Sequence, residues 1–342
     1  MVTYMNFRRI ILAAAAAALV LSMAGCKKDG AEGDGETTLG AEEYESRIAE
    51  LESQVESLKA ETVPNIQFKN KSDFIAGKYN PAVSEAAALK EEAMADMPEY
   101  ITIKGTEYST SLTSLTLNNM SLDNEDIKDL KYMINLTELH IYQNNISDIT
   151  PLKGLTNLHT LSLFKNEISD LSPLAGLVSL EDLYLRANNI TDISPLDGLV
   201  NLTALDLSEN EISDITPLAD MHNITLLRLN DNKITDISAL SGMKHMDRLH
   251  LQNNSIADIT PVTNMADLTE IYLDNNLVSN VEPLMSLTSL GWIKLGGNPV
   301  SNLQPLTNLT NLKKLYIEGT DIPENELASI QDKLTDTVIV TK

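Results

Sequence analysis

Eight copies of a 22-residue unit follow one another without interruption over residues 136–311. With the first leucine of each unit taken as position 1, positions 1, 4, 6, 11, 14, 17 and 20 are Leu, Ile, Val or Met in every copy. Seven positions in eight units make 56 sites without one polar exception. So strict a period predicts a stack of coils, each of which buries its apolar side chains against its neighbours.

Each unit also predicts its own local structure. Positions 3 to 7 alternate, which favours a short strand with positions 4 and 6 in the core and positions 3, 5 and 7 facing out. Thr150 and Pro151, with their counterparts in later units, are interpreted as a helix cap followed by proline at the first helical position. Seven of the eight units keep this proline, and Ala239 replaces it in the other.

Two polar positions of the unit are predicted to be structural. Position 9 is always Asn, whose amide can satisfy backbone groups left open in its own unit and in the next one. Position 13 carries six Asp and two Asn, and such a carboxylate row raises the possibility of calcium sites. Because Asp and Asn interchange there and no compact oxygen-rich loop is visible, hydrogen bonds to nearby backbone N–H groups are favoured and no metal site is expected. The position 13 residues are Asp148, Asp170, Asp192, Asp214, Asp236, Asp258, Asn280 and Asn302.

The consensus LxxLxLxxNxIxDIxPLxxL resembles the bacterial 22-residue leucine-rich repeat of the internalin-like type, over about residues 112–333. This resemblance implies an α/β solenoid, a right-handed superhelix with a parallel sheet on its concave face and short 3-10 or helical turns on its convex face. It also implies a protein that grips a partner with the concave face, as the internalins do.

The segments around the eight units are predicted to cap the stack. Residues 64–111 are interpreted as a linker and N-terminal cap, with a helix over residues 82–97 and two short strands around Gly105. The leucine-rich-repeat domain is assigned to residues 112–334, with an irregular first unit in which Asp123 caps a short helix. Residues 335–342 are expected to add a last strand. The apolar residues that lie near one side of the first helix are Val83, Ala86, Ala87, Met94 and Met97. Those expected to face inward from the other helices are Ile127, Leu130, Leu327, Ile330 and Leu334.

The N-terminus has the pattern of an export signal. Arg8 and Arg9 precede a short apolar run that ends in "LSMAGC", which resembles a bacterial lipoprotein cleavage site with Cys26 as the lipid-attachment residue. Residues 1–25 are therefore predicted to be a signal peptide; ordinary secretion or an uncleaved anchor are the alternatives. This assignment places the mature protein outside the cytoplasm, lipid-anchored to the bacterial cell membrane or envelope surface.

A tether and a stalk are expected to follow Cys26. Residues 26–40 are small and charged, as in a flexible tether. In residues 41–63 a 4-3 spacing of apolar residues between Tyr44 and Leu58 predicts a helical stalk or a coiled coil, so that residues 44–58 form either a homodimer seam or a single helix.

The charge and cysteine content exclude several classes of function. The chain has 49 acidic and 25 basic residues, a formal net charge of −24, which disfavours a nucleic-acid partner. Its only cysteine is Cys26, so no intrachain disulfide forms. Two of the five histidines, His140 and His250, lie on the inner face but five units apart, too far to cooperate. We therefore expect no enzyme activity and no cofactor.

The variable inner positions are the candidate functional residues. Positions 3, 5 and 7 of ten units make 30 sites, which hold six of the 15 Phe, Trp and Tyr residues, six acids and five bases. Aromatic side chains that face solvent beside a filled core are typical anchors for a partner. A protein or glycan is thus expected to bind between two aromatic groups and across a central basic strip, with an envelope scaffold in the same cell as the alternative. The candidates are Glu138, His140, Tyr142, Phe164, Asp182, Tyr184, Arg186, Asp206, Arg228, Arg248, His250, Glu270, Tyr272, Trp292, Lys294 and Tyr316.

Overall fold

The computed structural model describes residues 80–341, which lie in one compact unit. Cys26, the signal peptide, the tether and the stalk all lie outside the described residues, so the predictions for them stay predictions. Among the residues that are described, no helix is both long enough and apolar enough to span a membrane.

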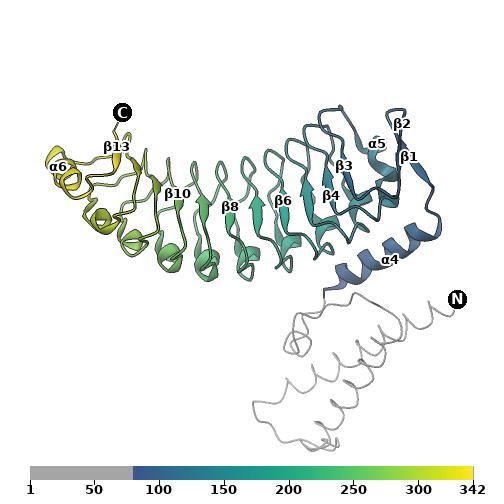
Figure 1. The fold of residues 1–342 in the computed structure, drawn as a ribbon, viewed down its shortest axis with the longest axis horizontal. Helices are drawn as coiled ribbons and strands as arrows, with labels where there is room; N and C mark the ends of the chain where they lie inside the picture. The colour runs from purple at the N-terminus through teal and green to yellow at the C-terminus, as the bar shows by residue number, and fades with distance from the viewer. Residues whose placement is uncertain (1–79, 342) are drawn as a thin grey trace, which may run out of the picture. The chain divides into compact units, whose positions relative to one another are not determined.

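A parallel sheet of eleven strands runs the length of this unit, and the strands follow the order of the chain from β3 to β13. Each repeat contributes one three-residue strand, and residues that are 22 apart pair directly, as Leu161 pairs with Leu183. Figure 1 shows the strands side by side along a curved body. The strands are β3 (Ser114–Thr116), β4 (Glu138–His140), β5 (Thr160–Ser162), β6 (Asp182–Tyr184), β7 (Ala204–Asp206), β8 (Leu226–Arg228), β9 (Arg248–His250), β10 (Glu270–Tyr272), β11 (Trp292–Lys294), β12 (Lys314–Tyr316) and β13 (Val338–Val340).

Short 3-10 helices return the chain on the side away from the strands, along the outer edge of the curve in Figure 1. The predicted leucine-rich-repeat solenoid, with its parallel sheet and 3-10 turns, is thereby confirmed. The 3-10 helices are η1 (Lys128–Tyr132), η2 (Thr150–Leu152), η3 (Ser172–Leu174), η4 (Ser194–Leu196), η5 (Thr216–Leu218), η6 (Ser238–Gly242), η7 (Thr260–Asn264), η8 (Glu282–Leu284) and η9 (Gln304–Asn308).

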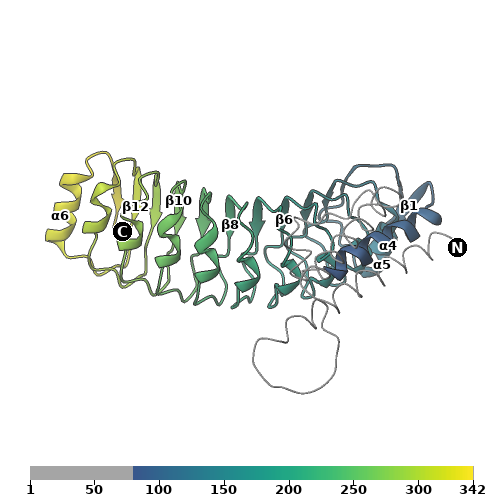
Figure 2. The ribbon, with the colours of Figure 1, turned by 90° about the horizontal axis from the view of Figure 1, so that it is seen from below.

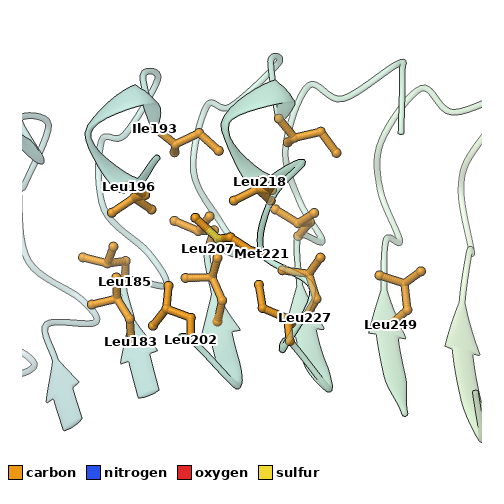
Figure 3. Packing of buried hydrophobic residues seen from close by; sticks show 14 of the residues in the cluster. Leu183, Leu185, Ile193, Leu196, Leu202, Leu207, Leu218, Met221, Leu227 and Leu249 are labelled. Carbon is orange, nitrogen blue, oxygen red and sulfur yellow. The ribbon is translucent and has the colours of Figure 1, made fainter. Parts of the chain in front are cut away.

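The aliphatic core fills the space between the sheet and these turns. All 56 repeat positions that are Leu, Ile, Val or Met are buried, with at most 2% of their surface exposed. Figure 3 shows Leu183 and Leu185 of one coil beside Leu207 of the next coil, with Leu227 in the coil after that. Burial of one such side chain contributes roughly 1.5–3 kcal/mol to the free energy of unfolding. Because all 56 are buried, many similar contacts between coils share the stabilisation of the stack.

The position 9 asparagines form a ladder in which six of the eight are buried, and they bond to their own coil and to the preceding coil. Asn188 donates from Nδ2 to Leu185 O in its own unit, at 2.9 Å, and to Leu163 O in the preceding unit, at 3.1 Å. Its Oδ1 accepts from the N–H of Ile168, at 3.0 Å. The predicted bond within the same unit is confirmed, and the predicted bond to the next unit is wrong because the chain turns inward after each strand and directs the amide toward the preceding coil.

The position 13 side chains cap the 3-10 helices, a role the sequence had assigned to Ser or Thr. Asp148 accepts from the N–H of Thr150 at 2.8 Å, and the same bond recurs in all eight units, with Asn in the last two. The predicted hydrogen bonds from position 13 to backbone N–H groups are therefore confirmed. The Ser or Thr at position 15 makes no side-chain cap bond, because it is already the first residue of the 3-10 helix.

The N-terminal end of the stack carries an antiparallel hairpin of β1 (Tyr100–Ile103) and β2 (Thr106–Ser109), followed by α5 (Asn124–Ile127). The helix α4 (Pro81–Ala95) lies along the turns of the first repeats, where it contacts Gly154 and Gly176. Asp123 caps α5 as predicted, and Ile127 and Leu130 are buried. At the other end lie α6 (Glu324–Lys333) and β13, where Ile330 and Leu334 are buried. Figure 2 shows α4 and α6 at opposite ends of the body.

The apolar side of α4 is only partly buried. Met94 and Met97 are 57% and 37% exposed, whereas Ala86 is buried. The helix lies so close to Gly176 that an added Cβ there would come within 2.6 Å of the Ala86 Cβ. Only a small side chain fits beside Gly176, whereas Met94 lies on the exposed side of the helix and Met97 lies beyond its end at Ala95.

Asn188→Ala should lower the free energy of unfolding by about 2–4 kcal/mol, because it leaves a buried N–H and two buried carbonyls without their partner. Asn189→Ala changes the same residue type at the adjacent, exposed position and should change stability by less than about 0.5 kcal/mol. Urea denaturation followed by circular dichroism measures both. Equal losses in the two variants would mean that the ladder does not hold the coils together.

Candidate functional site

The inner face of the sheet carries columns of side chains, because residues at the same repeat position pair across neighbouring parallel strands. We call the residues at position 5 the central column. Within it, a charge pair, a ring stack and cation–ring contacts involve six residues of the column. The central column consists of His140, Ser162, Tyr184, Asp206, Arg228, His250, Tyr272, Lys294 and Tyr316.

A shallow hollow of about 300 Å³ lies over the N-terminal part of this face. It forms where Ser162, a small and buried residue, is flanked in the central column by the larger His140 and Tyr184. One wall is the Phe164 ring, which stacks on Tyr142 with ring centroids 4.1 Å apart and an interplanar angle of 15°. The hollow is lined by His140, Ser162, Phe164, Tyr184, Arg186 and Asp206.

Asp206 was expected to face solvent, but only 7% of its surface is exposed. Its Oδ1 accepts from the hydroxyl of Ser208 at 2.5 Å and from the Ser208 N–H at 3.1 Å. Its Oδ2 lies 3.5 Å from Nη1 of Arg228. The larger side chains of neighbouring strands cover the short aspartate, so it forms part of the floor of the hollow.

The predicted basic strip in the middle of the face is not a row of free charges. Arg228 pairs with Asp206, and Arg248 lies 3.2 Å from the carboxylate of Asp247. Arg186 donates from Nε and Nη2 to Oε1 of Glu209, at 2.9 and 2.5 Å. The arginines are thus compensated by neighbouring carboxylates.

The C-terminal part of the face forms a continuous stack in the central column. The His250 and Tyr272 rings are 4.4 Å apart at 10°, and Nζ of Lys294 lies 4.0 Å from the centre of the Tyr272 ring and 5.3 Å from that of Tyr316. Nε2 of His250 is 3.0 Å from Oε1 of Glu270. In the C-terminal part of the face, the aromatic rings are therefore already in contact with the ammonium group of Lys294.

Burial shifts the ionisation of the C-terminal stack. Burial, with a smaller effect of the hydrogen bond to Glu270, raises the pKa of Tyr272 well above its usual range. Burial also lowers the pKa of His250, against the opposing effect of Glu270, and raises the pKa of Asp274. All three groups are therefore held toward their neutral forms. Trp292, in contrast, is 41% exposed beside this stack.

Sequence reasoning missed two residues of this site. Ser162 was not a candidate because it is small, although a small residue between two large ones in one column predicts a hollow. Glu209 was missed because it lies at position 8, outside the alternating strand, where the chain already turns. Within residues 80–341, no three His, Cys, Asp or Glu side chains are grouped so that they could hold a metal ion.

The buried His250 ring predicts a pH-dependent stability. Its folded-state pKa lies below the unfolded value of about 6.5, so protonation favours the unfolded chain and stability falls as the pH drops from about 6.5 toward the folded-state pKa. We expect His250→Gln to lose less stability than the wild type between about pH 7.5 and pH 5. Urea midpoints at each pH measure this difference, and parallel losses in the two proteins would contradict it.

Comparison with known proteins assigns the repeats to one family. A family model described as Leucine Rich repeats (2 copies) matches six overlapping segments from residues 134–176 to residues 244–286. Among curated proteins, none matches the chain.

Three solved structures illustrate the likeness. Internalin C2 from Listeria monocytogenes is 31% identical over 68% of this chain and 91% of its own, with a TM-score of 0.47. InlJ from Listeria monocytogenes is 23% identical over 75% of this chain and 58% of its own, with a TM-score of 0.55. The Arabidopsis receptor kinase HAESA, solved with the peptide hormone IDA and the co-receptor SERK1, is 23% identical over 62% of this chain and 39% of its own, with a TM-score of 0.54. The chain is therefore a leucine-rich-repeat protein that is similar to the internalins.

Proposed function

We propose that this protein is an extracytoplasmic recognition protein that binds a protein partner on the inner face of its sheet and is held to a membrane by a lipid on Cys26. The observation that carries the binding role is the placement of the aromatic side chains. The core is already filled by 56 buried aliphatic and methionine side chains, so packing does not require Tyr142, Phe164, Tyr184 and Trp292 on the solvent side of the sheet.

The ordering of these side chains also supports binding. Tyr142 and Phe164 are stacked, and Tyr272 is held between His250 and Lys294. Side chains that are already fixed lose little conformational entropy when a partner covers them, so more of the contact energy appears as affinity. HAESA, which shares this fold, was solved in complex with a peptide hormone, which is consistent with a protein or peptide ligand here.

The double variant Tyr184→Ala plus Trp292→Ala should weaken partner binding by at least about ten-fold, because buried aromatic anchors dominate interface energies. The full-length wild type is first used to capture its partner from envelope and host extracts, and dissociation constants of the variants are then compared by biolayer interferometry. A partner from the cell's own envelope indicates a scaffold, and a host protein indicates adhesion.

The matched control is Leu277→Ala plus Met285→Ala, which removes two exposed apolar side chains that are not at inner-face positions. This control should bind within about two-fold of the wild type. If both double variants bind like the wild type, the inner face is not the recognition surface.

Cys26→Ser should abolish incorporation of a labelled fatty acid and release the protein from the membrane fraction, because serine cannot carry the thioether-linked lipid. Partner binding should stay unchanged, since the lipid is proposed only to localise the protein. The lipid anchor is ruled out if the variant is still labelled or stays in the membrane fraction.

A further inference from the structure

The two aromatic groups of the inner face differ in one respect that bears on the ligand. In the C-terminal group, Lys294 already lies over Tyr272 and near Tyr316. Among the described residues, the cation–ring contacts involve Lys131 and Lys294, and none involves Phe164 or Tyr184. The rings of the N-terminal hollow therefore lack the cation that the C-terminal rings possess.

The charges around the hollow favour a positive guest. Four carboxylates lie on or beside its lining strands against two guanidinium groups and the ammonium group of Lys165, which gives a net formal charge of −1. The two guanidinium groups pair with Glu209 and Asp206. The carboxylates are those of Glu138, Asp182, Asp206 and Glu209, and the guanidinium groups are those of Arg186 and Arg228.

The floor of the hollow offers an acceptor in a shielded place. Asp206 is almost fully buried, and its Oδ1 is occupied by Ser208. Its Oδ2 has only the loose 3.5 Å contact with Arg228, which leaves room for a shorter charge-assisted bond. Aromatic rings and a shielded carboxylate line the same hollow, and these two kinds of group can together recognise an ammonium or guanidinium group.

We propose that this hollow is a binding site for a lysine or arginine side chain presented by the protein partner. The inference rests on the proposed function and adds the chemistry of the ligand. The alkyl stem of the basic side chain packs between Phe164 and Tyr184, and its charged end reaches toward Asp206. The net charge of −24 on the whole chain steers a basic segment toward the protein at long range.

The test uses fluorescent Gly/Ser peptides that carry spaced arginines or lysines, with citrulline and norleucine versions as neutral counterparts of similar shape. Fluorescence polarisation with the full chain should give at least about ten-fold tighter binding for the charged peptides than for the neutral ones. Equal affinities would overturn the proposal, as would a neutral oligosaccharide that competes for the hollow while the basic peptides do not.

Ring substitutions separate the hollow from general attraction to an acidic protein. Phe164→Leu and Tyr184→Leu keep the net charge of the protein and much of the side-chain volume. Each should lower the affinity for the arginine peptide about five- to ten-fold. Tyr100→Leu removes an exposed ring of β1 that is not on the inner face, so it is the matched control and should change the affinity for the arginine peptide by less than about two-fold. Wild-type affinity in both hollow variants would mean non-specific charge attraction only, and overturns the proposal. Their melting temperatures show whether a loss of affinity reflects unfolding.

The outcome is independent of the partner test above. If the ring variants leave peptide binding intact while Tyr184→Ala plus Trp292→Ala abolishes partner capture, the inner face binds its partner but not through a basic side chain. If peptides bind in the hollow while partner capture survives the double variant, the proposed recognition face is wrong although the hollow is a cation site.

Discussion

The buried asparagine ladder is the interaction on which the rest of the structure depends. After each strand the chain turns inward, and this turn leaves one N–H and two carbonyls without partners inside the core. One amide side chain supplies the acceptor and the donors that they need, and it joins each coil to the preceding one. No aliphatic side chain could do this, so a polar residue is required in every unit of an otherwise apolar interior.

Regular stacking has a direct consequence for the inner face. Because every strand pairs in register with the next, a side chain at position 5 always meets another at position 5. Arg228 therefore meets Asp206, and His250 meets Tyr272. The residue types in this column thus decide where neighbouring side chains pair with one another and where they leave a hollow, as at Ser162. The side chains of these columns can change without any change in the core.

Several features followed from residue type and period alone. The aliphatic columns, the short strands and the polar bonding of position 13 needed no tertiary information, since a period of 22 leaves only one face for each side chain. The direction of the asparagine bonds and the exposure of Met94 did not follow. Both depend on how neighbouring coils and helices pack against one another. For α4, the close approach to the repeats is possible because Gly176 has no Cβ.

The sequence by itself determined that the chain is a stack of leucine-rich coils and which residues line its inner face, because burial of an apolar column tolerates no other register. Only the tertiary structure decided what those residues do to one another. Lys294 lies over the Tyr272 ring, and Asp206 is buried between larger side chains. Phe164 lines a hollow that cannot be read from the sequence of one repeat. The physical reason is that side-chain pairing and burial depend on the distances between side chains on neighbouring strands. The repeat period shows which side chains are neighbours but not how far apart they lie.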